Sequence, residues 1–186
     1  DQPDYGPILT GYLAAEGETI ETASLIAPRV EAEIAFRLRA PLRGPGVSVL
    51  DVLAATDGVA PAIEVIDSRI EAWRIRLADT IADLASSARV VVGGCLTPVA
   101  GLDLRTVGVV LERRGEVVAT GAGAAALGHP AAAVAWAANT LGALGVTLEA
   151  GSLVMPGALH ASVPAVAGDT FRARFDGLGS VTVRFG

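Results

Sequence analysis

"PRVEAEIAFRL" (residues 28–38) alternates apolar and polar side chains and sets two glutamates one residue apart. Successive side chains of a β-strand point to opposite faces, so the alternation predicts a strand whose apolar face runs from Val30 to Phe36. Glu31 and Glu33 then share the other face, where their carboxylates can converge on one ion. The solvated face of an edge strand has the same pattern, so the spacing alone leaves both interpretations open.

A second predicted strand, "PAIEVIDSRI" (residues 61–70), carries one more acid within an apolar run. Apolar neighbours on both faces predict that Glu64 lies in a buried sheet, with no lysine nearby to neutralise it. Three hard oxygen donors suit Mg²⁺ or Mn²⁺ in an octahedral site with open positions. A 2-oxo or 2-hydroxy acid can fill those positions through its carboxylate and its C2 oxygen.

Length and composition suggest one domain in a larger assembly. The 186 residues suffice for one well-buried core, and we expect residues 1–186 to form a single domain. Apolar residues make up 52% of the chain and charged residues 18%, so we expect other subunits to cover part of its surface. A homo-oligomer is the simplest such assembly.

The charged and reactive residues argue against several classes of function. The net charge is -6 without any basic stripe, so nucleic acid is not an expected partner. All basic residues are arginine, which leaves no amine for a Schiff base. The single cysteine, Cys95, fits a reducing cytoplasm. Residues 117–148 carry no formal charge but are rich in alanine and interrupted by glycine and proline, so we expect them to be buried in protein and not to span a membrane.

Four further segments have clear local patterns. They predict a short helix over residues 48–56 capped by Ser48, a hairpin over 105–121, a helix over 129–145, and two alternating strands over 170–185. The part up to Pro28 has the glycine and proline punctuation of loops with short extended pieces. His129 and His160 have no motif that places a nucleophile beside them, and we expect both to be structural.

Several stretches carry a resemblance to a known family. They are "PRVEAEIAF", "DVLAATDGVAPAIEVIDSRIEAWRIRLADTIADLASS", "GEVVATGAGAAALGHPAAAVAWAANTLG" and the closing "GDTFRARFDGLGSVTVRF". Along its whole length the chain resembles the 2-keto-4-pentenoate hydratase and 4-oxalocrotonate decarboxylase family, within the fumarylacetoacetate hydrolase superfamily. The resemblance implies an α+β fold, a β-rich mixed sandwich or roll with a few short helices, like the fumarylacetoacetate hydrolase C-terminal domain. It also implies Mg²⁺ or Mn²⁺ held by Glu31, Glu33 and Glu64, and assembly into a homo-oligomer or with a related pathway enzyme.

The family contains two lyase activities, both in aromatic meta-cleavage catabolism. Hydratases add water to 2-hydroxypenta-2,4-dienoate to give 4-hydroxy-2-oxopentanoate, and decarboxylases release CO₂ from 2-oxohex-3-enedioate. "DQPDYG" with Asp4, and "AWRIRLADT" with Trp73 and Asp79, resemble the hydratases. "APLRGPG", "LDLRTVGVV" and "GAGAAALGHP" are at least as similar to the decarboxylases. We therefore expect a metal-dependent hydratase, with the decarboxylase as the alternative.

The resemblance also implies roles for four residues outside the metal site. Asp4 would move protons from a partly buried position, Asp79 would assist catalysis, and Ser86 and Arg69 would bind substrate. Each also has a structural interpretation. Asp4 would cap a turn, Asp79 would be an N-cap or a surface acid, Ser86 would be a satisfied loop hydroxyl, and Arg69 would pair with a nearby carboxylate.

The sequence departs from the family in two respects. Leu84 stands where the family usually has asparagine, which leaves open the polar contacts at that edge of the pocket. The family also continues upstream, with a helical segment and a Gly-x-Lys-x-Gly motif whose lysine is thought to help catalysis, and the sequence contains neither. Two interpretations follow: an upstream part belongs to the native protein, or this is a shortened relative that binds metal without turning substrate over.

Overall fold

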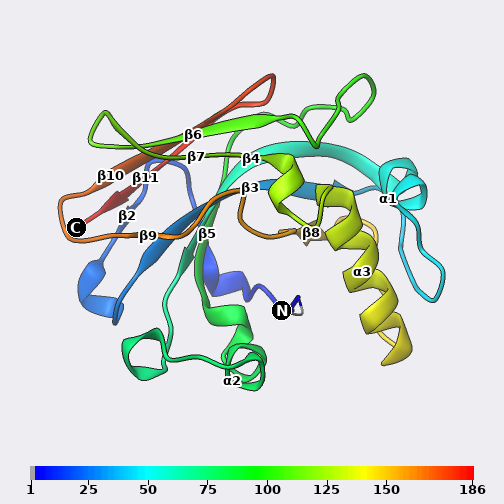
Figure 1. Ribbon diagram of the computed structural model, residues 1–186, viewed down its shortest axis with the longest axis horizontal. Coiled ribbons are helices and arrows are strands. Elements are labelled where there is room, and N and C mark those ends of the chain that lie inside the picture. The colour runs from blue at the N-terminus through cyan, green and yellow to red at the C-terminus, as the bar shows by residue number, and fades with distance from the viewer. Residues whose placement is uncertain (1–2) are drawn as a thin grey trace.

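The computed structural model describes residues 3–186, which form two β-sheets stacked face to face (Figure 1). Within those residues the first sheet has six strands. In spatial order they are β1 (Leu13–Ala14), β5 (Ser87–Val92), β4 (Thr56–Ile66), β3 (Arg29–Leu38) and β8 (Leu153–Val154), with β9 (Val163–Pro164) also paired to β3. The second sheet has five over the same range: β2 (Thr19–Ile20), β11 (Gly179–Phe185), β10 (Thr170–Phe175), β6 (Gly108–Arg113) and β7 (Glu116–Ala122). The expected α+β fold, a β-rich sandwich with a few short helices, is confirmed.

The hydrophobic core lies between the two sheets and is centred on β3. Alternate residues of this strand, from Val30 to Phe36, have no exposed surface. The alternate residues of β10 and β11 meet them from the other sheet, and Phe171, Val181 and Val183 are fully buried as well. Burying a side chain of this size stabilises the fold by about 1.5–3 kcal/mol. The inward faces predicted for residues 30–36 and 170–185 are therefore the observed ones.

β3 lies inside the first sheet and is not an edge strand. β4 pairs with its full length on one side, while β8 and β9 pair with its two ends on the other. Between β8 and β9, the Leu159 N–H donates to the Ala32 carbonyl at 3.0 Å, and His160 Nε2 accepts from the Ala32 N–H at 3.1 Å. His160 thus completes the hydrogen bonding of β3, as expected for a structural histidine.

The helices are short and lie outside the sandwich. α1 (Val49–Ala55) and α3 (Pro130–Ala143) pack together at one end, and α2 (Leu77–Ala82) lies apart from them (Figure 1). The expected capping box is present, because Ser48 accepts from the Asp51 N–H and Asp51 accepts from the Ser48 N–H. His129 caps α3 with a single hydrogen bond, because its Nδ1 accepts from the Ala131 N–H at 3.0 Å. Single 3-10 turns cover Thr10–Tyr12, Thr22–Ser24, Glu71–Trp73, Leu84–Ser86 and Gly123–Ala125.

Three segments refine the prediction. β4 begins at Thr56, directly after α1, and ends at Ile66, whereas the expected strand covered residues 61–70. β5 was not predicted, because most of its side chains are buried in the interior of the sheet and its sequence lacks a clear alternation. Residues 117–148 form most of β7 and all of α3, and in the described part of the chain no helix is long and apolar enough to cross a membrane.

Candidate metal centre

Three carboxylates meet on the face of the first sheet that is turned away from the sandwich core. Glu31 lies opposite Glu64 in the β3–β4 register, and Glu33 follows two residues later on the same face. One oxygen from each carboxylate lies within 4.8 Å of the other two. Glu33 is 1% exposed, and Glu31 and Glu64 are half-buried. The solvated-edge interpretation of the pair is therefore wrong.

The environment of the cluster favours protonated carboxyls in the absence of a cation. Burial raises the pKa of Glu31 to about 8, repulsion from Glu64 and Asp4 adds to the rise, and Arg29 opposes it. Burial and then repulsion from Glu64 and Glu31 raise the pKa of Glu33 well above its ordinary value. Burial also raises the pKa of Glu64, against hydrogen bonds from Ser87 and Glu33. Folding has thus placed acids where their ionisation is unfavourable.

Two polar groups from distant parts of the chain complete the immediate surroundings. The Gly157 N–H donates to Glu33 Oε2 at 2.8 Å, from a backbone with φ +112° that favours glycine. The Ser87 hydroxyl lies close enough to Glu64 to lower its pKa, yet its buried Oγ makes no hydrogen bond of ordinary geometry within residues 3–186. Such a buried hydroxyl calls for a further partner.

These features fit a hard divalent cation. Three carboxylates from rigid, paired strands are a donor set that Mg²⁺, Mn²⁺ and Ca²⁺ accept. Among residues 3–186, none of the three glutamates forms a salt bridge that would neutralise its charge within the protein. A bound cation would supply that charge and remove the cost of keeping three acids together.

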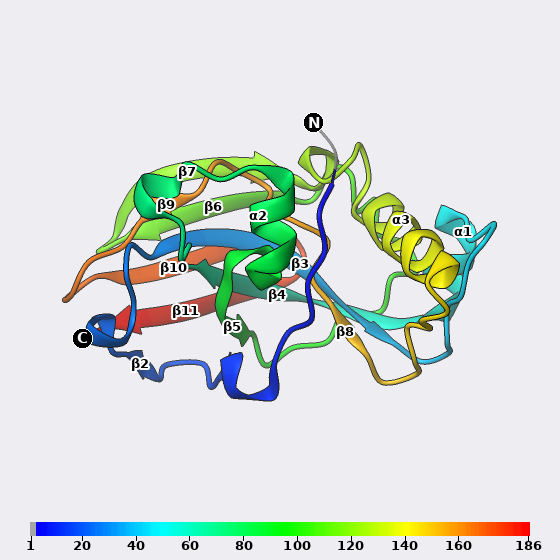
Figure 2. The same ribbon diagram turned by 90° about the horizontal axis from the view of Figure 1, so that it is seen from below.

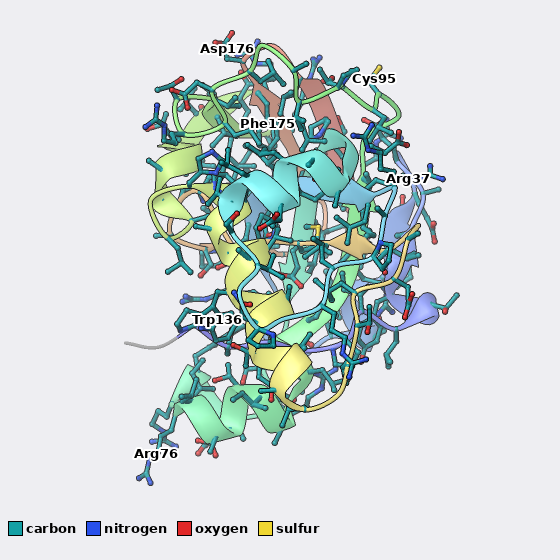
Figure 3. All side chains as sticks on the ribbon, turned by 90° about the vertical axis from the view of Figure 1, so that its right-hand side faces the viewer. Arg37, Arg76, Cys95, Trp136, Phe175 and Asp176 are labelled. Atoms are coloured by element: carbon teal, nitrogen blue, oxygen red, sulfur yellow. The ribbon has the colours of Figure 1, made fainter. Side chains whose placement is uncertain are left out.

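The N-terminal segment brings a fourth acid towards the cluster. It crosses in front of the first sheet, between α2 and α3 (Figure 2). On one side the Tyr5 ring lies 6.2 Å from the ring of Trp136, which Figure 3 labels on α3. On the other side Gly6 lies so close to the Leu84 backbone that a Cβ would come within 2.5 Å of the Leu84 carbonyl carbon. Asp4 directly precedes these two contacts, and its charge acts on Glu31 and Glu64. It is exposed, which corrects the partly buried position that we expected.

Arg69, Asp79 and Ser86 lie outside the carboxylate cluster. Arg69 Nη1 donates to Asp83 Oδ1 at 3.0 Å, and the Ser86 hydroxyl donates to Asp83 Oδ2 at 3.0 Å. Asp79 lies in the first turn of α2, where it accepts from the Arg76 N–H at 2.9 Å. Each polar group is bonded within the protein, in agreement with its structural interpretation, and their roles toward substrate stay predictions.

One cation, which was not singled out from the sequence, lies beside the cluster. Arg29 is two residues before Glu31 on the same face of β3, so one more step of the alternation identifies it. Its Nη1 donates to Ser162 Oγ at 3.1 Å, and its Cζ lies 5.3 Å from the centre of the Trp73 ring. Trp73 Nε1 in turn donates to the Ala27 carbonyl at 3.1 Å. The guanidinium is thus held in place without a carboxylate partner among residues 3–186.

A groove of about 480 Å³ lies along the same sheet face, beyond the carboxylates. Its walls include Leu13, Ala35, Ala60, Val90 and Val92, with Arg37 at the far end of the β3 face. Ala35 follows Glu33 on this face, and Val90 is the register partner of Glu64. The groove is therefore an apolar neighbour of the cluster and not part of it.

Comparison with known proteins identifies the family. The model for the fumarylacetoacetate (FAA) hydrolase C-terminal family matches residues 11–185. The chain belongs to that family. The resemblance to the 2-keto-4-pentenoate hydratases and 4-oxalocrotonate decarboxylases is confirmed as well. The chain is 49% identical to the 4-oxalocrotonate decarboxylase of Pseudomonas sp. (strain CF600) over 185 residues, which are 100% of this chain and 70% of the relative. It is 45% identical to the 2-keto-4-pentenoate hydratase of Paraburkholderia xenovorans (strain LB400), covering 100% of this chain and 69% of the hydratase.

A solved structure of this family supports the same fold. The 4-oxalocrotonate decarboxylase from Pseudomonas putida G7, complexed with magnesium and adipate, superposes with a TM-score of 0.96 at 45% identity, covering 100% of this chain and 71% of the decarboxylase. A second structure of that enzyme is complexed with calcium and acetate. The similar family members are hydratases and decarboxylases, both lyases, as the sequence predicted, and the solved decarboxylase binds divalent cations.

Proposed function

We propose that this chain is a metal-dependent hydratase that adds water to 2-hydroxypenta-2,4-dienoate to give 4-hydroxy-2-oxopentanoate in aromatic meta-cleavage catabolism. The observation that carries the proposal is the cluster of Glu31, Glu33 and Glu64, none of which forms a salt bridge among the described residues. These three side chains would hold Mg²⁺ or Mn²⁺. When bound, the cation supplies positive charge to the substrate's carboxylate and C2 oxygen.

The protein's own groups account for orientation and proton movement. The Gly157 N–H fixes one oxygen of Glu33, so the ligand set is held before substrate arrives. Asp4 would take the proton from the C2 hydroxyl as the dienol becomes the 2-oxo acid and would deliver a proton at C5. Water then adds at C4, with the accompanying proton at C3. Support for Asp4 comes from its charge, which acts on both Glu31 and Glu64 from the crossing segment.

Decarboxylation of 2-oxohex-3-enedioate is the second candidate function. It is favoured by the 49% identity to a decarboxylase, against 45% for the hydratase, and by the TM-score of 0.96 to the solved decarboxylase. Both reactions use the same metal site and differ in the bond that changes. A non-catalytic, metal-binding relative is the third possibility that the sequence left open. Under each of them we propose an oligomer of identical chains, in keeping with the apolar composition.

A pair of assays separates these functions. With Mg²⁺ or Mn²⁺ supplied, loss of dienol absorbance is followed with the pentadienoate, and CO₂ release with the oxohexenedioate. We expect faster turnover of the pentadienoate, and Glu33→Gln is the inactive control. CO₂ release alone would make the chain a decarboxylase. Tight Mg²⁺ binding without turnover of either substrate would make it a binding protein.

A further inference from the structure

One buried hydroxyl beside the carboxylate cluster lacks a hydrogen-bond partner. Ser87, the first residue of β5, is 3% exposed, and its Oγ makes no hydrogen bond of ordinary geometry within residues 3–186. The large majority of buried hydroxyls in proteins have a partner, because an unpaired polar atom has lost its hydrogen bonds to water and gained none in exchange. The surroundings of Ser87 must therefore supply that partner.

An irregularity in the strand pairing turns Ser87 towards the carboxylates. Glu64 pairs with Val90, and the same register would leave Ser87 opposite Asp67, on the core side of the sheet. The observed partner of Ser87 is instead Ile66, because the register shifts by one residue, as in a β-bulge. A shift of one residue moves a side chain to the other face of the sheet. Ser87 therefore shares the face of Glu64 and lies diagonally across from it.

We propose that Ser87 is a positioning residue, whose hydroxyl donates to the Glu64 carboxylate and orients it as a ligand for a divalent cation. The inference rests on the proposed metal-dependent function, and it applies equally to a hydratase and to a decarboxylase because both use the same ion. It extends that function to the choice of ion, because the hydroxyl should strengthen the preference of the site for Mg²⁺ over Ca²⁺.

Glu64 is a candidate ligand that needs such a donor. Glu33 is held by the Gly157 N–H at 2.8 Å, whereas the groups that lie within bonding reach of Glu64 among residues 3–186 are the Ser87 hydroxyl and the Glu33 carboxyl. The contact with Ser87 also lowers the pKa of Glu64, as a donor to its ionised form does. Partners of this kind fix the orientation of a metal ligand, and their loss costs about 10- to 100-fold in metal affinity.

The turn before β5 holds the backbone of Ser87 in place. Residues 84–86 have φ values of 58°, 57° and 55°, in the left-handed region that non-glycine residues avoid. Such backbone persists only where the surrounding contacts impose it. Two of these contacts are the hydrogen bond from the Ser86 hydroxyl to Asp83 Oδ2 at 3.0 Å and that from the Asp67 N–H to the Ser86 carbonyl at 2.8 Å. The Ser87 hydroxyl is therefore presented from a fixed position.

Mg²⁺ and Ca²⁺ differ in how much they depend on an oriented ligand. Mg²⁺ requires near-octahedral geometry, whereas Ca²⁺ accepts more oxygens in flexible arrangements. A Glu64 carboxylate that is free to turn would still suit Ca²⁺, but it would match the geometry of Mg²⁺ less often. Loss of the Ser87 hydroxyl should therefore weaken Mg²⁺ binding more than Ca²⁺ binding. A serine that only filled space would affect the two ions alike.

Ion binding to matched serine variants tests the proposal without requiring turnover. Calorimetry at one pH measures the Mg²⁺ and Ca²⁺ affinities of the wild-type chain and of each variant. We expect Ser87→Ala to lower Mg²⁺ affinity at least about tenfold and Ca²⁺ affinity by less than about threefold. Ser87→Thr keeps the hydroxyl and should retain most of the Mg²⁺ preference. Ser68→Ala is the control and should leave both affinities unchanged, because Ser68 is equally buried and its Oγ already accepts from the Ile70 N–H at 3.1 Å.

Thermal unfolding without added ions separates a positioning hydroxyl from a structural one. Ser87→Ala removes a buried polar atom that has no ordinary hydrogen bond among residues 3–186, so Tm should not fall, whereas loss of a structural hydrogen bond lowers it. Unchanged affinities, an equal loss for both ions, or the same loss of Mg²⁺ preference in Ser87→Thr as in Ser87→Ala would each overturn the proposal. None of these results touches the proposed lyase function, which fails only if the wild-type chain with Mg²⁺ or Mn²⁺ turns over neither unsaturated substrate.

Discussion

The two sheets use the same alternation of side chains with opposite results. On β10 and β11, every second residue faces the core, and the charged residues between them, Arg172, Arg174 and Arg184, are exposed. On β3, every second residue also faces the core, but the charged residues between them include Glu31 and the fully buried Glu33. Alternation therefore identifies the residues that share a face, but it does not show whether that face is exposed to solvent.

The difference shows which region was shaped by stability and which by function. Outward arginines on the second sheet cost nothing, because water solvates them. The acids on the first sheet are kept away from water and next to one another, which burial and repulsion both make unfavourable. A cluster of this kind persists where a bound ion or a reaction requires it.

Removing one acid from the cluster should have the largest effect. Glu33→Gln keeps the size of the side chain and removes its charge, so we expect Mg²⁺ affinity to fall at least about 100-fold and turnover to be lost. The metal-free protein should become more stable, because one buried acid is relieved. Calorimetry with Mg²⁺ and thermal unfolding without it measure the two effects.

Arg172→Gln provides the matched control on the second sheet. This exposed position should change the free energy of unfolding by no more than about 0.5 kcal/mol and leave Mg²⁺ affinity unaltered. Equal effects of the two substitutions on Mg²⁺ affinity would remove the distinction between the two faces.

The fourth acid near the cluster should act on turnover and not on metal binding. Asp4→Ala removes the proposed proton carrier, and general acid–base groups contribute about 100- to 10,000-fold. We expect kcat to fall within that range while the Mg²⁺ content measured by atomic emission stays at the wild-type value. Unchanged kcat would remove Asp4 from the mechanism, and lost metal would make it a ligand.

The affinity for Mg²⁺ should depend on pH through the buried acids of the first sheet, and not through the second sheet. Because burial raises the pKa of Glu31 to about 8, protons compete with the cation below that pH. Displacement of one proton per ion lowers the affinity about tenfold for each pH unit below the pKa. Titrations with Mg²⁺ between about pH 6 and pH 8, in buffers of different ionisation enthalpy, report both the affinity and the protons released. A flat profile would contradict the raised pKa.

The same acids determine whether the metal-free protein becomes more or less stable as the pH rises. A carboxyl group with a raised pKa binds its proton more tightly in the folded state, so it favours folding at low pH. That contribution should be lost as pH rises from the ordinary value of 4.5 through about 8. Thermal unfolding of the metal-free chain should therefore show Tm falling over this interval, and Glu31→Gln should reduce the fall.

The fold could be predicted where sequence and environment agree. Residues 30–37 and 170–185 alternate because each strand has one face in the core, so their period is visible in the sequence. β5 has no such contrast, because it lies between β4 and β1 with most side chains buried. A strand of this kind has a composition that an apolar loop or helix can share.

The site could be predicted only as far as local spacing extends. Glu31 and Glu33 are related by strand period, and Glu64 was joined to them as a third acid on a second predicted strand, with no lysine nearby to neutralise it. Gly157 is separated from Glu33 by 124 residues, and it donates to Glu33 through its backbone N–H. Because no side chain of Gly157 takes part, the sequence could not predict this contact. Ser87 is one of two adjacent serines, and only the fold decides which of them faces Glu64.

A smaller effect should follow from pushing the N-terminal segment away from the cluster. A Cβ on Gly6 would lie 2.5 Å from the Leu84 carbonyl carbon, so Gly6→Ala forces the two backbones apart and moves Asp4 with them. Misplacement of a catalytic group lowers the rate, and we expect a loss in kcat of up to about tenfold with Mg²⁺ affinity unchanged. Gly11→Ala is the control, because a Cβ there meets nothing within 4 Å. Equal kcat for both variants would show that the position of the N-terminal segment does not affect catalysis.

The smallest effect concerns the turn on which Gly6 rests. Leu84 has a φ of 58°, a conformation that asparagine tolerates better than leucine, so Leu84→Asn should raise the free energy of unfolding by up to about 1 kcal/mol. Leu127 has a φ of 49° and is exposed, so Leu127→Asn measures the conformational gain alone. Denaturant unfolding and kcat are measured for both variants. If kcat changes only in Leu84→Asn, the turn before β5 belongs to the functional face of the first sheet. If both variants gain stability and neither changes kcat, the turn is part of the scaffold, as the outer face of the second sheet is.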